Sequence, residues 1–267
     1  MSLKVIKFGE VITKKQIPVG IASDNINGPT VFKRPKFYPN GPQWIMYFAH
    51  HRGDGIRTAE SEELSRGWKV SNKLILGVET GHVASPEVLL HQDRLELYFH
   101  REHNDFQYTF KVTTEDGERW VEDDEVQGDF YLRTVGEQHA VAKHRNQGGI
   151  WYKRTNGKLV EQGRLLPKMR HCCHCEGKLY WSEIGDNPEV IYRGDLNLSE
   201  FTVSNKQKII VPSEHYEVTK NHRPSLPGSA VGVTEVRDPY AVKSEGKTFI
   251  FYTVRGEEAI AVAEIQE

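Results

Sequence analysis

A short strand rich in aromatic residues recurs five times along this chain, and this repeat limits the fold more than any other feature. The copies are Trp44-Ile-Met-Tyr-Phe48, Leu95-Glu-Leu-Tyr-Phe99, Gly149-Ile-Trp-Tyr152, Gly177-Lys-Leu-Tyr-Trp181 and Lys247-Thr-Phe-Ile-Phe-Tyr252. A turn containing Gly, Asn or Asp and then another strand follow each copy. Tyr47 and Tyr252 are 205 residues apart over four intervals, which gives about 51 residues per unit. That is the size of a four-stranded propeller blade.

A less aromatic strand precedes each copy and is predicted to be the innermost strand of its blade. These strands are Pro29-Thr-Val-Phe32, Pro86-Glu-Val-Leu-Leu90, His139-Ala-Val-Ala142, His171 to Cys175 and Pro239-Tyr-Ala-Val242. We therefore predict an all-β fold in which residues 1–267 form a single five-bladed β-propeller domain. A β-sandwich would also have short strands, but it would not repeat the same strand–turn–strand order five times.

Two irregular stretches also fit a ring of blades. The segment Leu3 to Ile12 is expected to supply the outer strand that closes the ring against the last blade. About 35 residues separate the fourth unit from the fifth, and there His222-Arg-Pro-Ser-Leu-Pro-Gly228 reads as an extended loop at the rim. The third unit is shorter than the others.

Composition excludes several classes of protein. Lys and Arg number 35 against 37 Asp and Glu, a balance that argues against a nucleic-acid partner. No apolar run approaches the ~18 residues of a membrane span, and the first 25 residues contain no signal-peptide core. Three cysteines fit a reducing compartment without a disulfide framework. We expect a cytoplasmic protein with a small-molecule partner and no membrane partner.

Blade topology predicts which residues meet. Inner strands begin on one face of a propeller, and the turns after the second strands return to that face, where a ligand funnel forms. Seven of the twelve histidines belong to this predicted face. The residues that we expect to bind substrate there are His50, His51, His82, His100, His139, Arg170, His171, Arg237 and Glu257.

Several motifs resemble those of the five-bladed propeller glycosidases, the superfamily of arabinanases, xylosidases, invertases and agar-oligosaccharide hydrolases. Ser85-Pro86-Glu87-Val88 is similar to the Ala-Pro-acid-Val stretch in the second blade of arabinanases. Arg237-Asp238-Pro239, followed by Gly246-Lys-Thr-Phe-Ile-Phe-Tyr252 and Ile260-Ala-Val-Ala263, resembles a blade signature of the same branch. Ala59-Glu-Ser61 with Gly67-Trp68 resembles a blade ending, and Thr113-Thr-Glu-Asp116-Gly117 with Trp120 resembles an Asp-box turn.

The resemblance implies roles for particular acids. In that superfamily a first-blade Asp is the base or nucleophile, and a third-blade Glu is the general acid. An acid in the second blade tunes pKa and orientation. Glu87 matches the second-blade acid, and Glu137 is the nearest third-blade acid. Where the superfamily has Asp-Pro in the first blade, this chain has Gly28-Pro29, and the only nearby carboxylate is Asp24.

Glycoside hydrolysis needs a protonated acid on one side of the scissile bond and an ionised group on the other. Because glycine supplies neither, three alternatives remain open. Asp24 reaches the site, or Asp238 substitutes from the fifth blade, or a histidine is the acid or base. The last alternative is implied by the agar-oligosaccharide branch, and its candidates are His82, His100 and His139.

The segment His171-Cys-Cys-His-Cys175 suggests zinc at first sight. Consecutive residues of a strand alternate sides, so they cannot close a tetrahedral site alone. Small cysteines buried between inner strands are the better interpretation, and we assign no metal ligand. A divalent cation in the central funnel stays open as a cofactor.

These patterns predict a glycoside hydrolase acting on a small oligosaccharide, with Asp24, Glu87, Glu137 and Asp238 as candidate catalytic residues. The concentration of Arg and His makes an anionic sugar, uronate or sulfated, an open possibility. Two alternatives are a propeller that binds carbohydrate without catalysis and a metal-dependent polysaccharide lyase.

Overall fold

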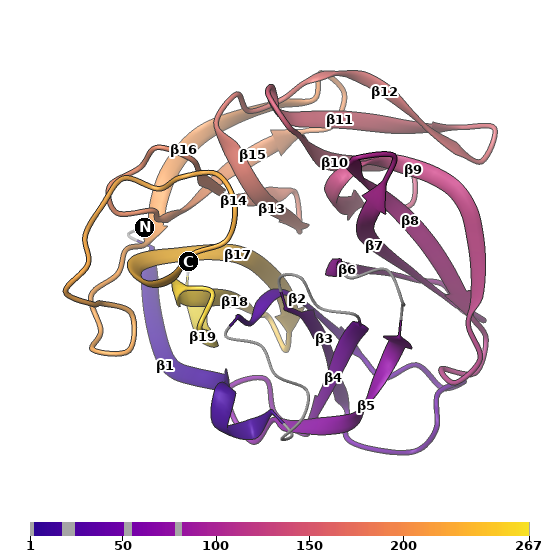
Figure 1. The fold of residues 1–267 in the computed structure, drawn as a ribbon, viewed down its shortest axis with the longest axis horizontal. Helices are drawn as coiled ribbons and strands as arrows, with labels where there is room; N and C mark the ends of the chain where they lie inside the picture. Colours follow the sequence, from indigo (N-terminus) through magenta and orange to yellow (C-terminus); the bar gives the residue numbers. More distant parts are fainter. Residues whose placement is uncertain (1–2, 18–24, 51–54, 78–81, 267) are drawn as a thin grey trace.

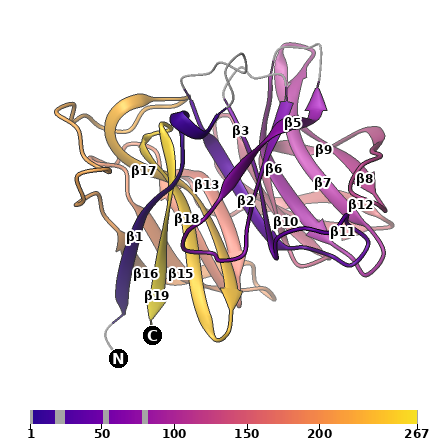
Figure 2. The same ribbon diagram turned by 90° about the horizontal axis from the view of Figure 1, so that it is seen from below.

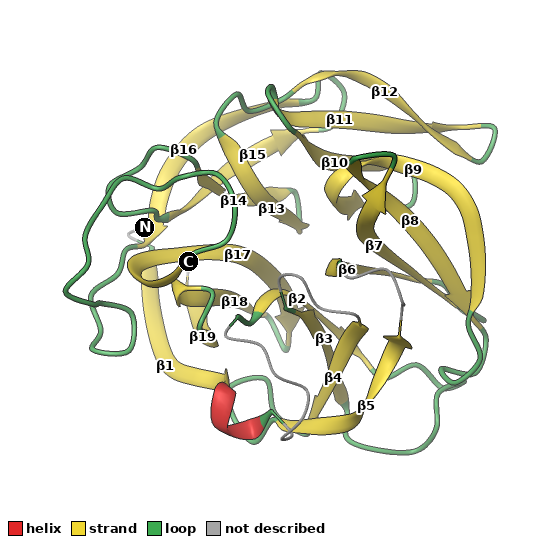
Figure 3. Ribbon diagram, in the orientation of Figure 1, coloured by secondary structure: helices red, strands yellow, loops and turns green. Residues whose placement is uncertain are grey.

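Antiparallel β-sheets arranged around a central axis make up almost all of this molecule (Figure 1; Figure 3). The computed structural model describes residues 3–17, 25–50, 55–77 and 82–266. The helix in this part of the chain is the short 3-10 turn Lys14–Gln16. None of the helices within these ranges is long and apolar enough for a membrane span.

The strands group into five blades, as predicted. Blade 1 contains β2 (Asn27–Lys33), β3 (Trp44–Ala49), β4 (Gly55–Ser61) and β5 (Lys69–Gly77). Blade 2 contains β6 (Val83–Leu90), β7 (Leu95–His103), β8 (Phe106–Thr114) and the first part of β9 (Val121–Val135). Blade 3 contains the second part of β9, β10 (His139–His144), β11 (Gly148–Thr155) and β12 (Lys158–Arg164).

The remaining two blades complete the ring. Blade 4 contains β13 (Met169–Cys175), β14 (Lys178–Glu183), β15 (Ile191–Asn197) and β16 (Thr202–Ile210). Blade 5 contains β17 (Val231–Ser244), β18 (Lys247–Gly256), β19 (Ala259–Gln266) and the N-terminal β1 (Lys4–Thr13). Strand β1 lies beside β19 and pairs with it from Lys4 to Thr13 (Figure 2). The predicted closing strand is therefore present.

Strand β9 belongs to two blades and corrects the predicted third unit. Its first part pairs with β8 and its second part, 130–135, pairs with β10, so blades 2 and 3 form one seven-stranded sheet. The inner strand of blade 3 is thus 130–135, and the predicted inner strand beginning at His139 is the second strand. The crossover was missed because the chain passes from one blade into the next within one continuous strand, although Gly128 and Asp129 stand at that point.

The hydrophobic core lies between the blades. The described residues form five buried clusters, and each one joins two neighbouring blades. For example, Phe48 of blade 1 and Phe251 of blade 5 share one cluster, whereas Tyr98 of blade 2 and Ile150 of blade 3 share another. Because every blade uses both of its faces, the aromatic strands of the repeat stabilise the ring as a whole.

The cysteines also contribute to this core. Cys172 packs into the cluster between blades 3 and 4, and Cys173 packs into the cluster between blades 4 and 5. The backbone N–H of Ala241 donates to Cys173 Sγ at 3.1 Å. Burial raises the pKa of the Cys172 thiol to about 12. Adjacent cysteines on opposite faces of β13 fill two inter-blade spaces, as the strand alternation predicted.

Candidate active site

All five inner strands contain the same β-bulge, near the end that faces the funnel. In each strand two residues oppose one residue of the neighbouring strand, and the register shifts accordingly. The bulged pairs are Gly28-Pro29, Ser85-Pro86, Tyr131-Leu132, Arg170-His171 and Asp238-Pro239. Because a bulge turns side chains out of the regular alternation, this ring of bulges directs several polar side chains toward the axis.

The bulges of blades 1, 2 and 5 lie close together. Gly28 has φ +58°, and a Cβ atom at Gly28 would lie 2.8 Å from the Cα of Ser85. The backbone N–H of Gly28 points to Asp238 Oδ2 at 3.4 Å. Glycine is therefore the residue that fits this position, because a side chain there would collide with Ser85 of blade 2.

An acid–base pair joins blades 4 and 5. His171 Nδ1 contacts Asp238 Oδ1, and both side chains are buried, with exposed fractions of 5% and 1%. The second carboxylate oxygen of Asp238 accepts from the hydroxyl of Thr253 at 3.4 Å. Within the described part of the chain, His171 Nε2 has no hydrogen-bond partner.

The protonation of this pair follows from its surroundings. Burial alone would raise the pKa of Asp238, but contacts with His171 and Arg237 outweigh it and lower the pKa to about 2. Burial lowers the pKa of His171 and outweighs the opposing effect of Asp238. A carboxylate only accepts hydrogen bonds, so His171 Nδ1 carries the proton and Nε2 has a free lone pair. At neutral pH the pair is an ionised Asp238 that orients a neutral imidazole.

Beside this pair lies a buried network of arginines and carboxylates. The guanidinium of Arg237 contacts Glu235, Glu257 at 3.1 Å and Glu189 at 3.5 Å. Glu189 also accepts from Arg170 Nε at 2.9 Å. Each buried charge thus has an opposite partner, which is the condition under which charges persist in a protein interior.

The extended loop between blades 4 and 5 is bound to this network. Arg170 donates to Ser225 Oγ at 2.9 Å and to the carbonyl of Gly228 at 3.0 Å. Arg237 donates to the same carbonyl at 3.2 Å. The loop therefore lies at the rim of the funnel, where the sequence predicted it.

Glu257 connects the network to blade 1. It accepts from the side-chain amides of Asn25 and, at 3.4 Å, Asn27. Its backbone carbonyl accepts from Ile26 N–H at 2.6 Å. Glu257 therefore holds the start of the first inner strand against the last blade.

Two further histidines reach the same centre from blade 2. His82 Nε2 and His100 Nε2 are 3.0 Å apart, and both residues are buried. The ring of Tyr131 lies between His100 and His171, with centroid separations of 4.7 and 4.1 Å. A continuous series of aromatic rings thus extends from blade 2 to the His171–Asp238 pair.

Glu87 of blade 2 is bound by residues of blade 3. Its carboxylate pairs with Arg133 at 3.0 Å and accepts from the backbone N–H of Thr134 at 2.9 Å and its hydroxyl at 2.7 Å. Both members of the ion pair are buried. The carboxylate is thus already occupied by blade 3, and it fixes the inner strands of blades 2 and 3 to each other.

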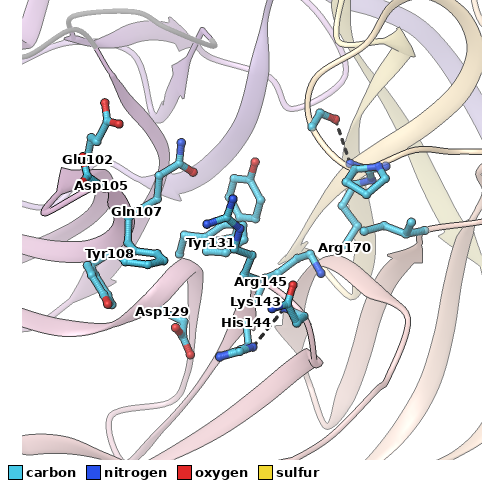
Figure 4. Close-up of a pocket in the computed structure, with 16 residues that line it drawn as sticks. Glu102, Asp105, Gln107, Tyr108, Asp129, Tyr131, Lys143, His144, Arg145 and Arg170 are labelled. Carbon is cyan, nitrogen blue, oxygen red and sulfur yellow. Dashed lines mark hydrogen bonds between the residues drawn. The ribbon is translucent and has the colours of Figure 1, made fainter.

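A cavity of about 580 Å³ opens beside the axis, between blades 2, 3 and 4 (Figure 4). Its volume lies within the usual range for small-molecule sites. Tyr131 and Arg170 line it, and the ring of Tyr131 contacts the ring of His171, which together with Asp238 lies behind this lining. The other polar side chains that line it are Glu102, Asp105, Gln107, Tyr108, Asp129, Lys143, His144, Arg145 and Asn146.

Most of the predicted site residues do lie near the axis. His171, Arg237, Asp238 and Glu257 belong to one buried network with Arg170, and His82 and His100 reach it through Tyr131. His50 is buried directly after β3. Asp24 and His51 lie outside the described residues, so their predicted roles stay predictions.

Two predicted residues lie elsewhere. Glu137 and His139 follow the inner strand of blade 3, so they occupy the opposite face of the ring. The side chain of Glu137 is 68% exposed and lies near His91, and His139 packs near Trp151 and Phe201. Their placement in the funnel was wrong because the third blade was assigned one strand too late.

The same misassignment hid residues that do face the cavity. Tyr131 occupies the third bulge, Lys143 and His144 end strand β10, and Arg145 and Asn146 belong to the turn that follows it at the funnel face. The short third unit was the available signal, since a unit that is too short indicates a missing strand. Asp129 carries no comparable signal, because it lies in the middle of a long strand.

The described donor groups near the axis pair with one another. Within the described ranges no three His, Cys, Asp or Glu side chains group as metal ligands. His171 and Asp238 bind each other, and His82 and His100 face each other. The divalent cation that the sequence left open stays a prediction, and we derive no step through one.

Comparison with known proteins supports the fold. A glycosyl hydrolase from Bacteroides ovatus superposes with a TM-score of 0.61 at 7% identity, covering 91% of this chain and 84% of that one. A GH43 β-xylosidase/α-arabinofuranosidase from a compost microbial metagenome, solved with xylotriose, gives 0.60 at 10% identity, covering 96% and 95%. At such low identities the likeness concerns the fold alone.

Sequence comparison adds one relative. The uncharacterised protein R118 of Acanthamoeba polyphaga mimivirus is 25% identical over 297 aligned positions, which cover 90% of this chain and 83% of that protein. No family model matches the chain. The assignment of function therefore depends on the site itself.

Proposed function

We propose that this protein is a glycosidase that acts on a small oligosaccharide held in the cavity beside the propeller axis. The fold is shared with proteins that process glycans, and the cavity combines aromatic with polar side chains. Phe106 at its edge is half exposed and lies near Tyr108, with ring centroids 6.4 Å apart. Exposed aromatic faces beside convergent polar groups suit the alternating apolar and hydroxyl surfaces of a sugar.

The His171–Asp238 pair is the observation that carries this proposal. A neutral imidazole, oriented by a buried carboxylate and with Nε2 unoccupied, is suited to take a proton from water as the water attacks the anomeric carbon. Asp238 stays ionised and stabilises the imidazolium that forms. This arrangement combines two of the separate alternatives from the sequence, a fifth-blade acid and a catalytic histidine, but it uses His171, which was predicted from the sequence to bind substrate.

The leaving oxygen needs a second group that donates a proton. The carboxyl groups that line the cavity, Glu102, Asp105 and Asp129, are the candidates among the described residues. Glu87 is proposed as a positioning residue, because its oxygens are already bound by Arg133 and Thr134. Glu137 is excluded from this role by its place on the opposite face.

Turnover of a panel of oligosaccharides tests this proposal. The panel should contain xylo-, arabino-, manno- and uronate-containing oligosaccharides, with products separated by chromatography. The wild type is expected to hydrolyse at least one of them, and Asp238→Asn is expected to lose most of that activity while it still binds. No turnover of any substrate by the wild type would contradict the proposal.

A carbohydrate-binding protein without catalysis is the second candidate. The observation that favours it is Gly28, which leaves no side chain at the first-blade position where the superfamily carries its Asp. Calorimetry that shows saturable binding of an oligosaccharide, without product after long incubation, would support this function. A polysaccharide lyase would instead produce an unsaturated sugar that absorbs in the ultraviolet, and the same reactions would show it.

A further inference from the structure

Basic side chains gather at the blade 3 and blade 4 side of the cavity. Lys143 and His144 are the last residues of strand β10, Arg145 follows them, and Arg170 projects from β13 (Figure 4). Glu102 and Asp105 line the blade 2 side, at the turn between β7 and β8. Asp129 lies on β9 and is bound by the hydroxyl of Tyr152 at 2.8 Å. The cavity is therefore cationic on one side and acidic on the other.

Lys143 stands apart from the other cations. Its exposed fraction is 7%, so more than nine-tenths of the residue is buried, yet it lines the cavity. Among the described residues its ammonium has no hydrogen-bond or ion-pair partner, whereas Arg170 is bound by Glu189, Ser225 and the loop carbonyls. A buried charged group without a partner is costly, and native proteins seldom keep one without a use.

The surroundings of Lys143 favour an anion. Burial, assisted by the charge of Arg170, lowers the pKa of Lys143 to about 8. A bound anion would compensate both the lost hydration of the ammonium and its repulsion by Arg170. Arg145, which is exposed and lies over the ring of Phe106 at 5.8 Å, can close the same site from the rim.

We propose that Lys143 binds a carboxylate or sulfate group carried by the sugar, so that the cavity selects an anionic saccharide. This proposal rests on the proposed function, which supplies the saccharide ligand, but it concerns the binding of that ligand and not its hydrolysis. Lys143 makes the charge-assisted hydrogen bond, and Arg170 contributes positive charge, since its own donors are largely used by Glu189 and the loop.

Calorimetry with matched sugars tests the site without requiring catalysis. The probes are xylose and glucose against glucuronate, galactose against galacturonate, and inorganic sulfate alone. The wild type is expected to bind each uronate about tenfold to a hundredfold more tightly than its neutral counterpart, the effect of one charge-assisted hydrogen bond. Lys143→Met should abolish that preference and leave the affinity for the neutral sugar unchanged.

Two variants serve as controls. Lys143→Arg keeps the charge and should retain the preference, and Lys153→Met removes an exposed lysine at the opposite end of blade 3 and should behave as the wild type. Equal affinity for charged and neutral sugars, a preference that survives in Lys143→Met, or binding of inorganic sulfate without any preference for the uronates would each overturn the proposal. A uronate preference without turnover of any oligosaccharide would leave this site in place and refute the glycosidase.

Discussion

Glu87 of blade 2 and Arg133 of blade 3 form a buried ion pair with a separation of 3.0 Å. The resemblance to propeller glycosidases had placed Glu87 among the catalytic acids. The ion pair indicates a structural role for Glu87, because its carboxylate also accepts hydrogen bonds from the backbone N–H and the hydroxyl of Thr134.

Replacing Glu87 by Gln should therefore destabilise the fold. The variant leaves Arg133 buried without its counter-charge, and the expected loss is about 3–5 kcal/mol of unfolding free energy, measured by urea denaturation. The control is Glu125→Gln, which breaks an exposed pair with Lys158 and should cost less than about 1 kcal/mol. A Glu87→Gln protein as stable as the wild type would show that the pair contributes nothing.

Gly28→Ala should disturb the contact between blades 1 and 2. The new Cβ would lie 2.8 Å from the Cα of Ser85, at a φ of +58°. We expect a loss of about 2–3 kcal/mol in urea, from strain and from movement of the bulge. Gly157→Ala is the matched control, because Gly157 has φ +79° but no atom within 4 Å of the new Cβ. Equal losses in the two variants would mean that the close approach to Ser85 is unimportant.

Asp238 should make the protein sensitive to acid. Its pKa is about 2 in the folded state against an ordinary 3.8, so below pH 4 the unfolded state binds more protons. The stabilisation is complete above about pH 4 and is lost as the pH falls toward 2, by about 2–3 kcal/mol in total. Urea denaturation at several pH values should show this loss in the wild type, but not in Asp238→Asn. The same acid dependence in both proteins would exclude Asp238 as its source.

The sequence predicts the ring and much of its centre because both depend on local repetition. The aromatic strands mark second strands in four blades, and the segment before Ile12 completes the fifth blade as expected. Residues next to inner-strand starts, such as His171 and Asp238, meet because every inner strand begins on the same face. That argument uses topology alone and needs no knowledge of side-chain contacts.

The remaining features depend on information that local patterns do not contain. Strand β9 crosses between blades without a turn, so Tyr131 and Lys143 could not be assigned to the funnel. The pairing of Glu87 with Arg133 joins residues 46 positions apart, on two blades. Alternation and turn residues reveal strands, but they do not reveal which charges neutralise each other across a ring.

The kinetic effect of a single histidine substitution tests the glycosidase account most directly. On the oligosaccharide that the wild type hydrolyses fastest, His171→Gln should reduce kcat by about 10²–10⁴-fold, the usual contribution of a general base. His139→Gln, on the opposite face, should keep wild-type activity, and thermal melting should show that both variants are folded. A folded His171→Gln enzyme with the activity of the wild type would contradict the account.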